Sequence, residues 1–166
     1  MKGTNKIMAK LKIVKVGDDT LRKVCRPVDE ITPKVIKLLD DMVETMRDAD
    51  GVGLAAPQVG ILRRIVVIEV EEGEVIELIN PKIIAYAGEN TGLEGCLSLP
   101  GQWGVVTRPM YVTVRALNRH GETVEYKGSD LLARCFCHEL DHLDGKLYPD
   151  VADRMLTPDE IEELRG

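Results

Sequence analysis

The sequence contains no long hydrophobic run, no apolar leader segment and only three histidines. Its longest apolar stretches, such as residues 65–68, are far too short to span a bilayer, so we expect no membrane partner. The first ten residues, MKGTNKIMAK, are polar and lysine-rich, precede no apolar stretch and lack the arginines of a transit peptide. These absences predict a cytoplasmic protein whose four cysteines form no disulfides.

An excess of basic residues is also missing, because 22 Lys and Arg face 28 Asp and Glu, for a net charge of −6. This balance argues against a direct nucleic-acid function. The charge is uneven, however, since residues 1–37 hold ten Lys and Arg against four Asp and Glu, a net +6 that leaves −12 for the remainder. Such asymmetry is typical of two differently solvated faces.

Three helices are predicted from apolar spacing and capping residues. The first begins at Thr32-Pro33, where threonine suits the N-cap and proline the first helical position. The second spans residues 129–143, with Ser129 as its N-cap and Gly145 just past its end. Residues 157–160 form a capping box for a short last helix.

Strands are expected mainly in the middle of the chain. Segment 11–16 alternates weakly and predicts an edge strand, and two hairpins pair 61–70 with 74–80 and 109–117 with 122–127. Helices and antiparallel strands are thus segregated rather than alternating, which predicts the α+β class. No repeat or linker interrupts the chain, so we expect a single domain over residues 1–166.

The sequence His138-Glu139-Leu140-Asp141-His142 lies inside the second predicted helix. Residues four apart share a helix face, so the two imidazoles can bind one metal ion while the glutamate reaches an adjacent water. A surface helix with two unrelated histidines is the alternative, although two of only three histidines fall here. We therefore expect antiparallel strands packed around a central metal-binding helix.

A catalytic site of this kind needs a third protein ligand and one open position. The three-histidine pattern is not met, because Tyr148 stands where its last histidine would be, and the glutamates at 160, 162 and 163 lie in a polar helix. Cys135 comes from the same helix as the histidines, which makes it a poor third ligand. Cys96 lies in the separate glycine- and proline-containing segment 94–101 and can approach the ion from outside the helix.

The glycine-rich segment 51–56 mimics a dinucleotide-binding fingerprint, but it follows a helix instead of a strand. We interpret it as a loop whose backbone approaches a ligand closely. Gln58 follows directly, and its uncharged amide suits the stabilisation of an oxyanion.

Three segments together resemble the motifs of the peptide deformylase family: GVGLAAPQ (51–58), EGCLS (94–98) and HELDH (138–142). The resemblance covers nearly the whole chain and implies a single catalytic domain of α+β fold. It implies removal of the formyl group from N-formylmethionyl nascent peptides, with release of formate. It also implies one divalent metal ion, Fe²⁺ in the cell, for which Zn²⁺, Ni²⁺ or Co²⁺ can substitute.

The resemblance further implies a role for each matching residue. The expected metal ligands are Cys96, His138 and His142, and Glu139 is the expected acid/base. The oxyanion donors are the Gln58 side chain and the Leu97 backbone N–H. The positions around the methionine side chain and the peptide backbone are Val52, Gly53, Glu94, Leu131 and Cys135.

Three departures from the family pattern concern the surroundings of this ligand set. Cys137 replaces a common glutamine, Trp103 replaces an arginine of some members, and the tail TPDEIEELRG is short and acidic where some members carry a basic helix that docks on the ribosome. Any ribosome contact should therefore be weak and use the N-terminal lysines Lys2, Lys6, Lys10, Lys12 and Lys15. A metallopeptidase and a closed, non-catalytic metal site completed by Cys135 or Cys137 are the alternative functions.

Overall fold

Two antiparallel sheets form the β structure of residues 9–166, the part of the chain that this computed structural model describes. The first sheet has the strand order β1-β2-β3-β6-β7 and the second has the order β4-β5-β8. The strands of the first sheet are β1 (Gly53–Ala55), β2 (Ile65–Ile68), β3 (Ile76–Ala87), β6 (Tyr111–Leu117) and β7 (Thr123–Ser129). Those of the second are β4 (Asn90–Cys96), β5 (Leu99–Arg108) and β8 (Arg154–Met155).

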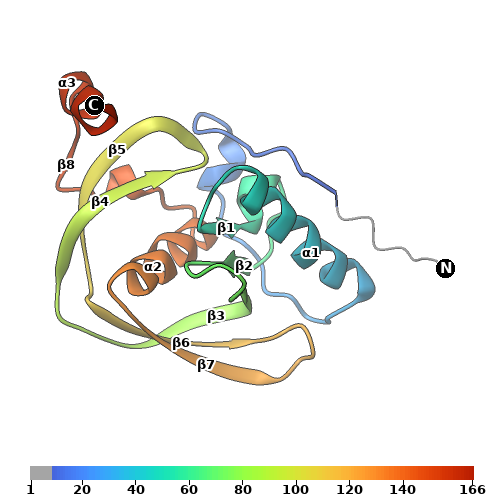
Figure 1. The fold of residues 1–166 in the computed structure, drawn as a ribbon. Helices are drawn as coiled ribbons and strands as arrows, with labels where there is room; N and C mark the ends of the chain where they lie inside the picture. The colour runs from blue at the N-terminus through green and yellow to red at the C-terminus, as the bar shows by residue number, and fades with distance from the viewer. Residues whose placement is uncertain (1–8) are drawn as a thin grey trace.

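Helices cover both faces of the five-stranded sheet. In Figure 1, α2 lies between β4 and β5 on one side and β3, β6 and β7 on the other, while α1 lies beyond β1 and β2. The α-helices are α1 (Pro33–Asp48), α2 (Leu131–Leu143) and α3 (Pro158–Arg165). Short 3₁₀ turns are η2 (Asp19–Arg22), η3 (Ala56–Val59) and η4 (Tyr148–Asp150). The predicted α+β class is confirmed, and no helix in residues 9–166 has the length and apolar character needed to cross a membrane.

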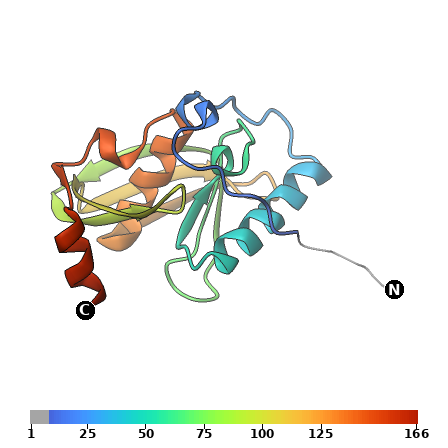
Figure 2. The ribbon, with the colours of Figure 1, turned by 90° about the horizontal axis from the view of Figure 1, so that it is seen from above.

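Strand β2 shows how the chain builds two cores around one sheet. Ile65 and Val67 pack in the cluster that includes α1, and Val66 and Ile68 pack in the cluster that includes α2. Successive side chains of a strand point to opposite faces, so a strand buried on both faces must be apolar throughout. The two helices accordingly lie on opposite sides of β1 and β2 when the molecule is seen from above (Figure 2).

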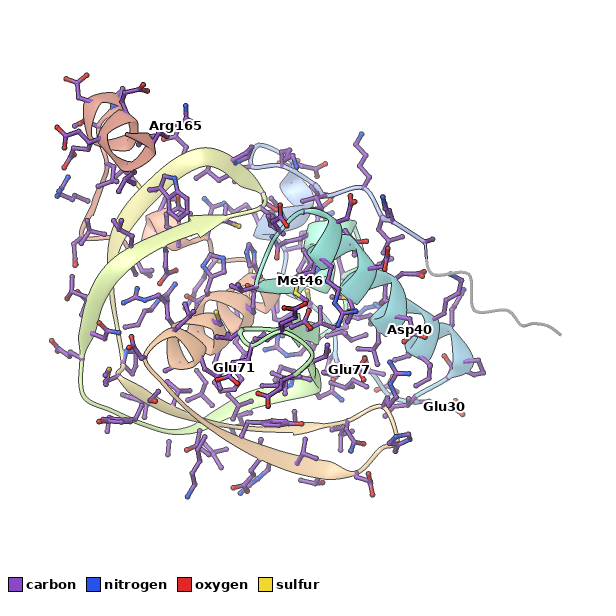
Figure 3. All side chains as sticks on the ribbon, in the orientation of Figure 1. Glu30, Asp40, Met46, Glu71, Glu77 and Arg165 are labelled. Atoms are coloured by element: carbon purple, nitrogen blue, oxygen red, sulfur yellow. The ribbon has the colours of Figure 1, made fainter. Side chains whose placement is uncertain are left out.

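The middle of α1 is tied to the five-stranded sheet by charged groups. Asp40 of α1 and Glu77 of β3, both labelled in Figure 3, accept hydrogen bonds from the guanidinium of Arg119 at 2.7 Å and 2.6 Å. Arg119 lies in the turn between β6 and β7, so one side chain joins that hairpin to a helix and to a neighbouring strand.

Local signals predicted most helix ends correctly. The Thr32 hydroxyl accepts from the Val35 N–H at the start of α1, and Thr157 caps α3 in the same way. The two predicted hairpins form as β2–β3 and β6–β7. One cap is wrong, because Ser129 ends β7 and the N-cap of α2 is Asp130, whose side chain makes no capping bond.

Two other expectations are wrong, and one hairpin was not expected at all. Segment 11–16 is no strand, although the Val14 N–H donates to the Gln58 carbonyl at 2.7 Å and the Val16 N–H to the Ser98 carbonyl at 2.8 Å. Residues 53–55 form a strand instead of a loop, because they pair with β2. Segment 94–101 belongs to the β4–β5 hairpin, which the sequence did not predict.

Gly145→Ala should lower the free energy of unfolding by more than about 2 kcal/mol, because two costs combine. Gly145 has φ +73°, and an added Cβ would collide with the backbone carbonyl of Arg22. Gly73→Ala is the matched control, since Gly73 has φ +86° but nothing within 4 Å of an added Cβ. Its loss should be near 1 kcal/mol in urea titrations. Equal losses of stability in the two variants would mean that the backbone near Arg22 can move to accommodate the added Cβ at little cost.

Candidate active site

Two histidines and a cysteine from different elements converge beside α2. The rings of His138 and His142, one helical turn apart, have centroids 5.1 Å apart. Cys96, the last residue of β4, places its Sγ 3.4 Å from the His142 Nε2. One donor atom from each of the three residues lies within 4.8 Å of the other two. A thiolate with two imidazoles suits a borderline-soft divalent ion, and three protein ligands leave a position open.

A buried carboxylate fixes the orientation of His138. The His138 Nδ1 lies 2.8 Å from the Glu94 Oε1, which leaves the Nε2 free for an ion. Glu94 also accepts hydrogen bonds at 2.8 Å from Arg108 and from Arg134. Burial alone would raise the pKa of Glu94, but its bonds with Arg108 and His138 hold it at about 2. Partners of this kind set the ring orientation and basicity of a metal-binding histidine.

Glu139 has the environment of a proton carrier. Its side chain is buried, and its Oε1 has no hydrogen-bond partner among the described residues. Burial raises the pKa of Glu139 to about 7, where a carboxyl can both accept and release a proton at neutral pH. Gly53 of β1 faces it closely, because an added Cβ there would lie 2.5 Å from the Glu139 Oε2. Only a glycine admits this approach.

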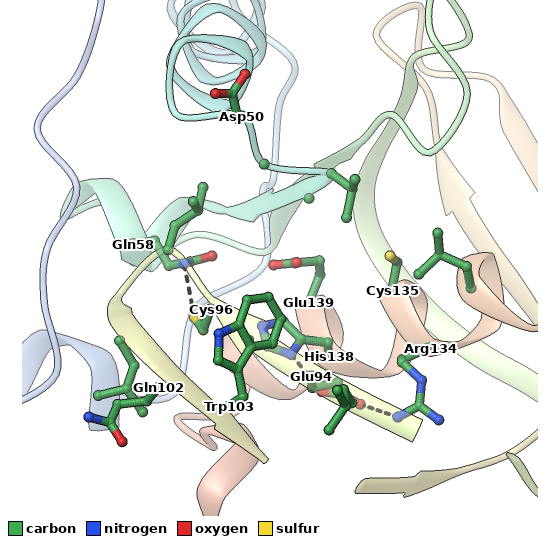
Figure 4. A pocket seen from close by; sticks show the side chains of 18 of the residues that line it. Asp50, Gln58, Glu94, Cys96, Gln102, Trp103, Arg134, Cys135, His138 and Glu139 are labelled. Carbon is green, nitrogen blue, oxygen red and sulfur yellow. Dashed lines mark hydrogen bonds and ion pairs between the residues drawn. The ribbon is translucent and has the colours of Figure 1, made fainter. Parts of the chain in front are cut away.

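The amide of Gln58 is held from both ends. Its Oε1 accepts from the Ala55 N–H at 3.0 Å, and its Nε2 donates to the Ser98 Oγ at 3.1 Å and lies 3.5 Å from the Cys96 Sγ. Figure 4 shows the Gln58 amide pointing toward Cys96, across the site from Glu94. Leu97 lies in the turn between β4 and β5, next to Cys96. Sequence reasoning missed Ser98, whose hydroxyl fixes the amide.

A pocket of about 430 Å³ opens beside these groups. Gln58, Cys96, Leu97, His138 and Glu139 line it, whereas His142 does not. All five residues expected around the substrate also line it, namely Val52, Gly53, Glu94, Leu131 and Cys135. Further lining residues that sequence reasoning did not identify include Asp50, Leu93, Gln102 and Arg134.

Three other residues that the sequence brought into question have distinct environments. Burial raises the pKa of Cys135 to about 12 and that of Cys137 to about 11, so both thiols stay protonated at neutral pH. Neither belongs to the three-donor group among the described residues. The Tyr148 ring stacks on His138 with centroids 5.9 Å apart, and its buried hydroxyl has no partner among residues 9–166. These environments give no support to a closed four-ligand site.

Comparison with known proteins identifies the family. The family model for polypeptide deformylase matches residues 10–157. A curated peptide deformylase of Agathobacter rectalis is 58% identical over 149 residues, which cover 90% of this chain and 94% of that protein. A curated peptide deformylase of Lachnoclostridium phytofermentans is 59% identical over 162 residues, which cover 94% of this chain and 99% of that protein.

Solved structures agree with the sequence relatives. The crystal structure of a peptide deformylase from Legionella pneumophila matches with a TM-score of 0.84 at 40% identity, covering 95% of this chain and 96% of that one. The peptide deformylase of Thermotoga maritima matches with a TM-score of 0.84 at 39% identity, over 87% and 98% of the two chains. The chain therefore belongs to the peptide deformylase family, whose known function is the deformylation of N-formylmethionine peptides.

Proposed function

We propose that Cys96, His138 and His142 hold one divalent metal ion, and that the adjoining pocket releases formate from N-formylmethionyl nascent peptides. The observation that carries this proposal is the convergence of three donor atoms within 4.8 Å beside a buried glutamate that has an unpartnered oxygen. A divalent ion there supplies a nucleophile at neutral pH, because it lowers the pKa of water.

Several groups of the protein have separate roles in the proposed reaction. Glu139 takes a proton from the attacking water and passes it to the leaving amine, as its pKa of about 7 allows. Negative charge grows on the formyl oxygen, where the Gln58 amide and the Leu97 backbone N–H donate hydrogen bonds. Gly53 admits the substrate backbone close to Glu139. The formyl carbon carries a hydrogen where an ordinary peptide carbonyl carbon carries a Cα, so a cramped site accepts the formyl group and rejects ordinary peptide carbonyls.

The methionine side chain fits the apolar part of the pocket. Val52, Leu131 and the neutral thiol of Cys135 line it. Glu94 lines it as well, but its oxygens bind His138, Arg108 and Arg134, so we assign it a positioning role in addition.

The proposed metal is Fe²⁺, with Zn²⁺, Ni²⁺ or Co²⁺ able to replace it. One thiolate and two imidazoles accept all four ions, so metal availability decides occupancy. We further propose that residues 1–166 act as a single catalytic domain in the cytoplasm. Metal analysis of protein purified without oxygen tests the identity of the ion.

Formate release from a formyl-Met peptide should depend on added iron or nickel. The assay compares the metal-loaded protein with the same protein after chelation, and it follows an unformylated peptide of the same sequence in parallel. Cleavage of the unformylated peptide would indicate a metallopeptidase instead. A rate no higher than in the chelated sample would reject the assignment.

We also propose a weak ribosome contact through the basic N-terminal segment. Lys10 is engaged with Asp48 at 2.9 Å, and Lys15 donates a hydrogen bond to the Leu97 carbonyl at 3.4 Å, which leaves Lys12 as the better candidate among these described lysines. Lys2 and Lys6 lie outside the described residues. Contacts with RNA phosphate release counterions and are therefore steeply salt-dependent.

Charge reversal of Lys12 should weaken co-sedimentation with ribosomes at low salt without changing formate release from a short peptide. Lys82→Glu, an exposed change on β3, is the control for net charge. Ribosome binding that is unchanged in Lys12→Glu would show that Lys12 does not make this contact.

A further inference from the structure

Trp103 of β5 forms part of the pocket mouth. Its side chain lines the pocket and is 40% exposed. An added Cβ on Gly95 would lie 2.8 Å and 2.9 Å from the Cζ3 and Cε3 of the indole, so the six-membered ring rests against Gly95. Figure 4 shows the Trp103 indole in front of His138. Because Gly95 directly precedes Cys96, the ring has a fixed place beside the reacting centre.

Apolar side chains form much of the pocket rim. Four lining side chains retain substantial exposure, with Val52 at 41%, Leu93 at 43%, Trp103 at 40% and Leu131 at 47%. Of the charged lining residues, Glu94, Arg134 and Glu139 are buried, and the first two bind each other at 2.8 Å. Asp50 and the polar Gln102 are exposed at the same rim. Exposed apolar groups around a pocket mark a surface that a ligand covers.

The path of the substrate follows from its covalent structure. Its formyl group must reach Glu139 and Cys96. Its methionine side chain takes the part of the pocket that Val52, Leu131 and Cys135 line, which leaves Leu93 and Trp103 as the exposed apolar groups beyond it. The rest of the nascent chain is continuous with that methionine, so it must leave through the mouth and cross the exposed rim. Trp103 offers the largest apolar surface there.

We infer that Trp103 is a specificity-determining residue, which favours apolar side chains in the two residues that follow formylmethionine. This inference rests on the proposed function. An apolar side chain gains contact with the indole, whereas a polar side chain loses water there and gains no hydrogen bond from the face of the ring. The preference should therefore be expressed in KM more than in kcat.

The first test compares kcat/KM for formyl-Met-Leu-Leu-amide and formyl-Met-Ser-Ser-amide. The unmodified enzyme should favour the leucine peptide by about 10-fold, which is the scale of partial burial of one apolar side chain. Trp103→Ala should reduce this ratio to about 2-fold or less by raising KM for the leucine peptide, and Trp103→Phe should keep most of it. Tyr86→Ala, which removes a 73% exposed aromatic group outside the pocket lining, should leave the ratio unchanged.

The outcomes separate this inference from the proposed function. Metal content is measured in each variant, because a change at Trp103 could disturb Cys96 through Gly95. If Trp103→Ala loses metal, the peptide preference of Trp103→Phe is used to test the inference instead. No formate release from either peptide would reject the proposed function. Release from both peptides with the same ratio in the metal-loaded enzyme and in Trp103→Ala would overturn the role of Trp103 alone.

The second test is a direct optical one, because Trp103 is the only tryptophan in the chain. Formyl-Met-Leu-Leu-amide is titrated into the slow variant Glu139→Gln while tryptophan emission is recorded. The emission should shift to shorter wavelength and saturate with the peptide concentration, and the serine peptide should produce a smaller shift. Calorimetric binding of the leucine peptide without any change in emission would overturn the inference.

Discussion

Glu139→Gln should retain the metal ion and lose about 10² to 10⁴ in the rate of formate release, the contribution of a positioned acid/base. The amide has nearly the same shape, so the three-donor group of Cys96, His138 and His142 stays in place, but no carboxylate remains to accept a proton. The loss should lie mainly in kcat, since Glu139 acts on the transferred proton and not on the methionine side chain. Steady-state formate release and metal analysis of the same sample measure both quantities.

The control for this variant neutralises another carboxylate near the same helix. Asp144→Asn changes the C-cap residue of α2, which is paired with Arg64 on the surface and lies outside the pocket lining. The rate of formate release by Asp144→Asn should stay within about 2-fold of that of the parent protein, because surface substitutions usually disturb a protein little. If Glu139→Gln instead emerges without metal, Glu139 is itself a ligand and the proposed division of roles is wrong.

Cys96→Ser should lower metal affinity by at least about 100-fold and activity with it. Losing even a supporting partner of a ligand typically costs 10- to 100-fold, and a hydroxyl is a far poorer ligand than a thiolate. Competition with a chelator measures the affinity. The thiolate band of the cobalt-loaded protein should disappear, which identifies the lost bond independently of activity.

Cys137→Ala is the matched cysteine variant and should keep most of its metal and activity. Cys137 lies next to His138, yet its thiol is buried, stays protonated and lies outside the three-donor group. Equal losses in Cys96→Ser and Cys137→Ala would point to a closed structural site. In that case the cobalt spectrum of the parent protein would show more than one thiolate.

The sequence was informative where the signal is local. The start of α1 at Thr32 and the capping box of α3 at Thr157 depend on residues three or four apart, so each can be recognised without the fold. The same holds for the pair His138 and His142, which one helical turn brings together. Cys96 lies 46 positions from His142 in the chain, and it was predicted by comparing the possible third ligands and then from the family resemblance.

Distant partners could not be predicted in this way. Arg108 and Arg134 reach Glu94 across 14 and 40 positions, and no pattern in the chain distinguishes them from surface arginines. The β4–β5 hairpin was missed because its glycines interrupt the apolar alternation that marks a strand. Strand β1 was missed because three residues are too few to show a period, and only pairing with β2 makes them a strand.

The segment that contains Val14 and Val16, before η2, connects the two halves of the site through backbone hydrogen bonds. The Gln58 side of the site belongs to the chain that follows β1, and the Ser98 side belongs to the β4–β5 turn, so the two halves depend on different sheets. Val14 and Val16 donate one hydrogen bond to each half. The amide protons of Val14 and Val16 therefore exchange with solvent only when this segment separates from the two halves of the site. A ligand that holds the two halves together slows that exchange without touching either valine.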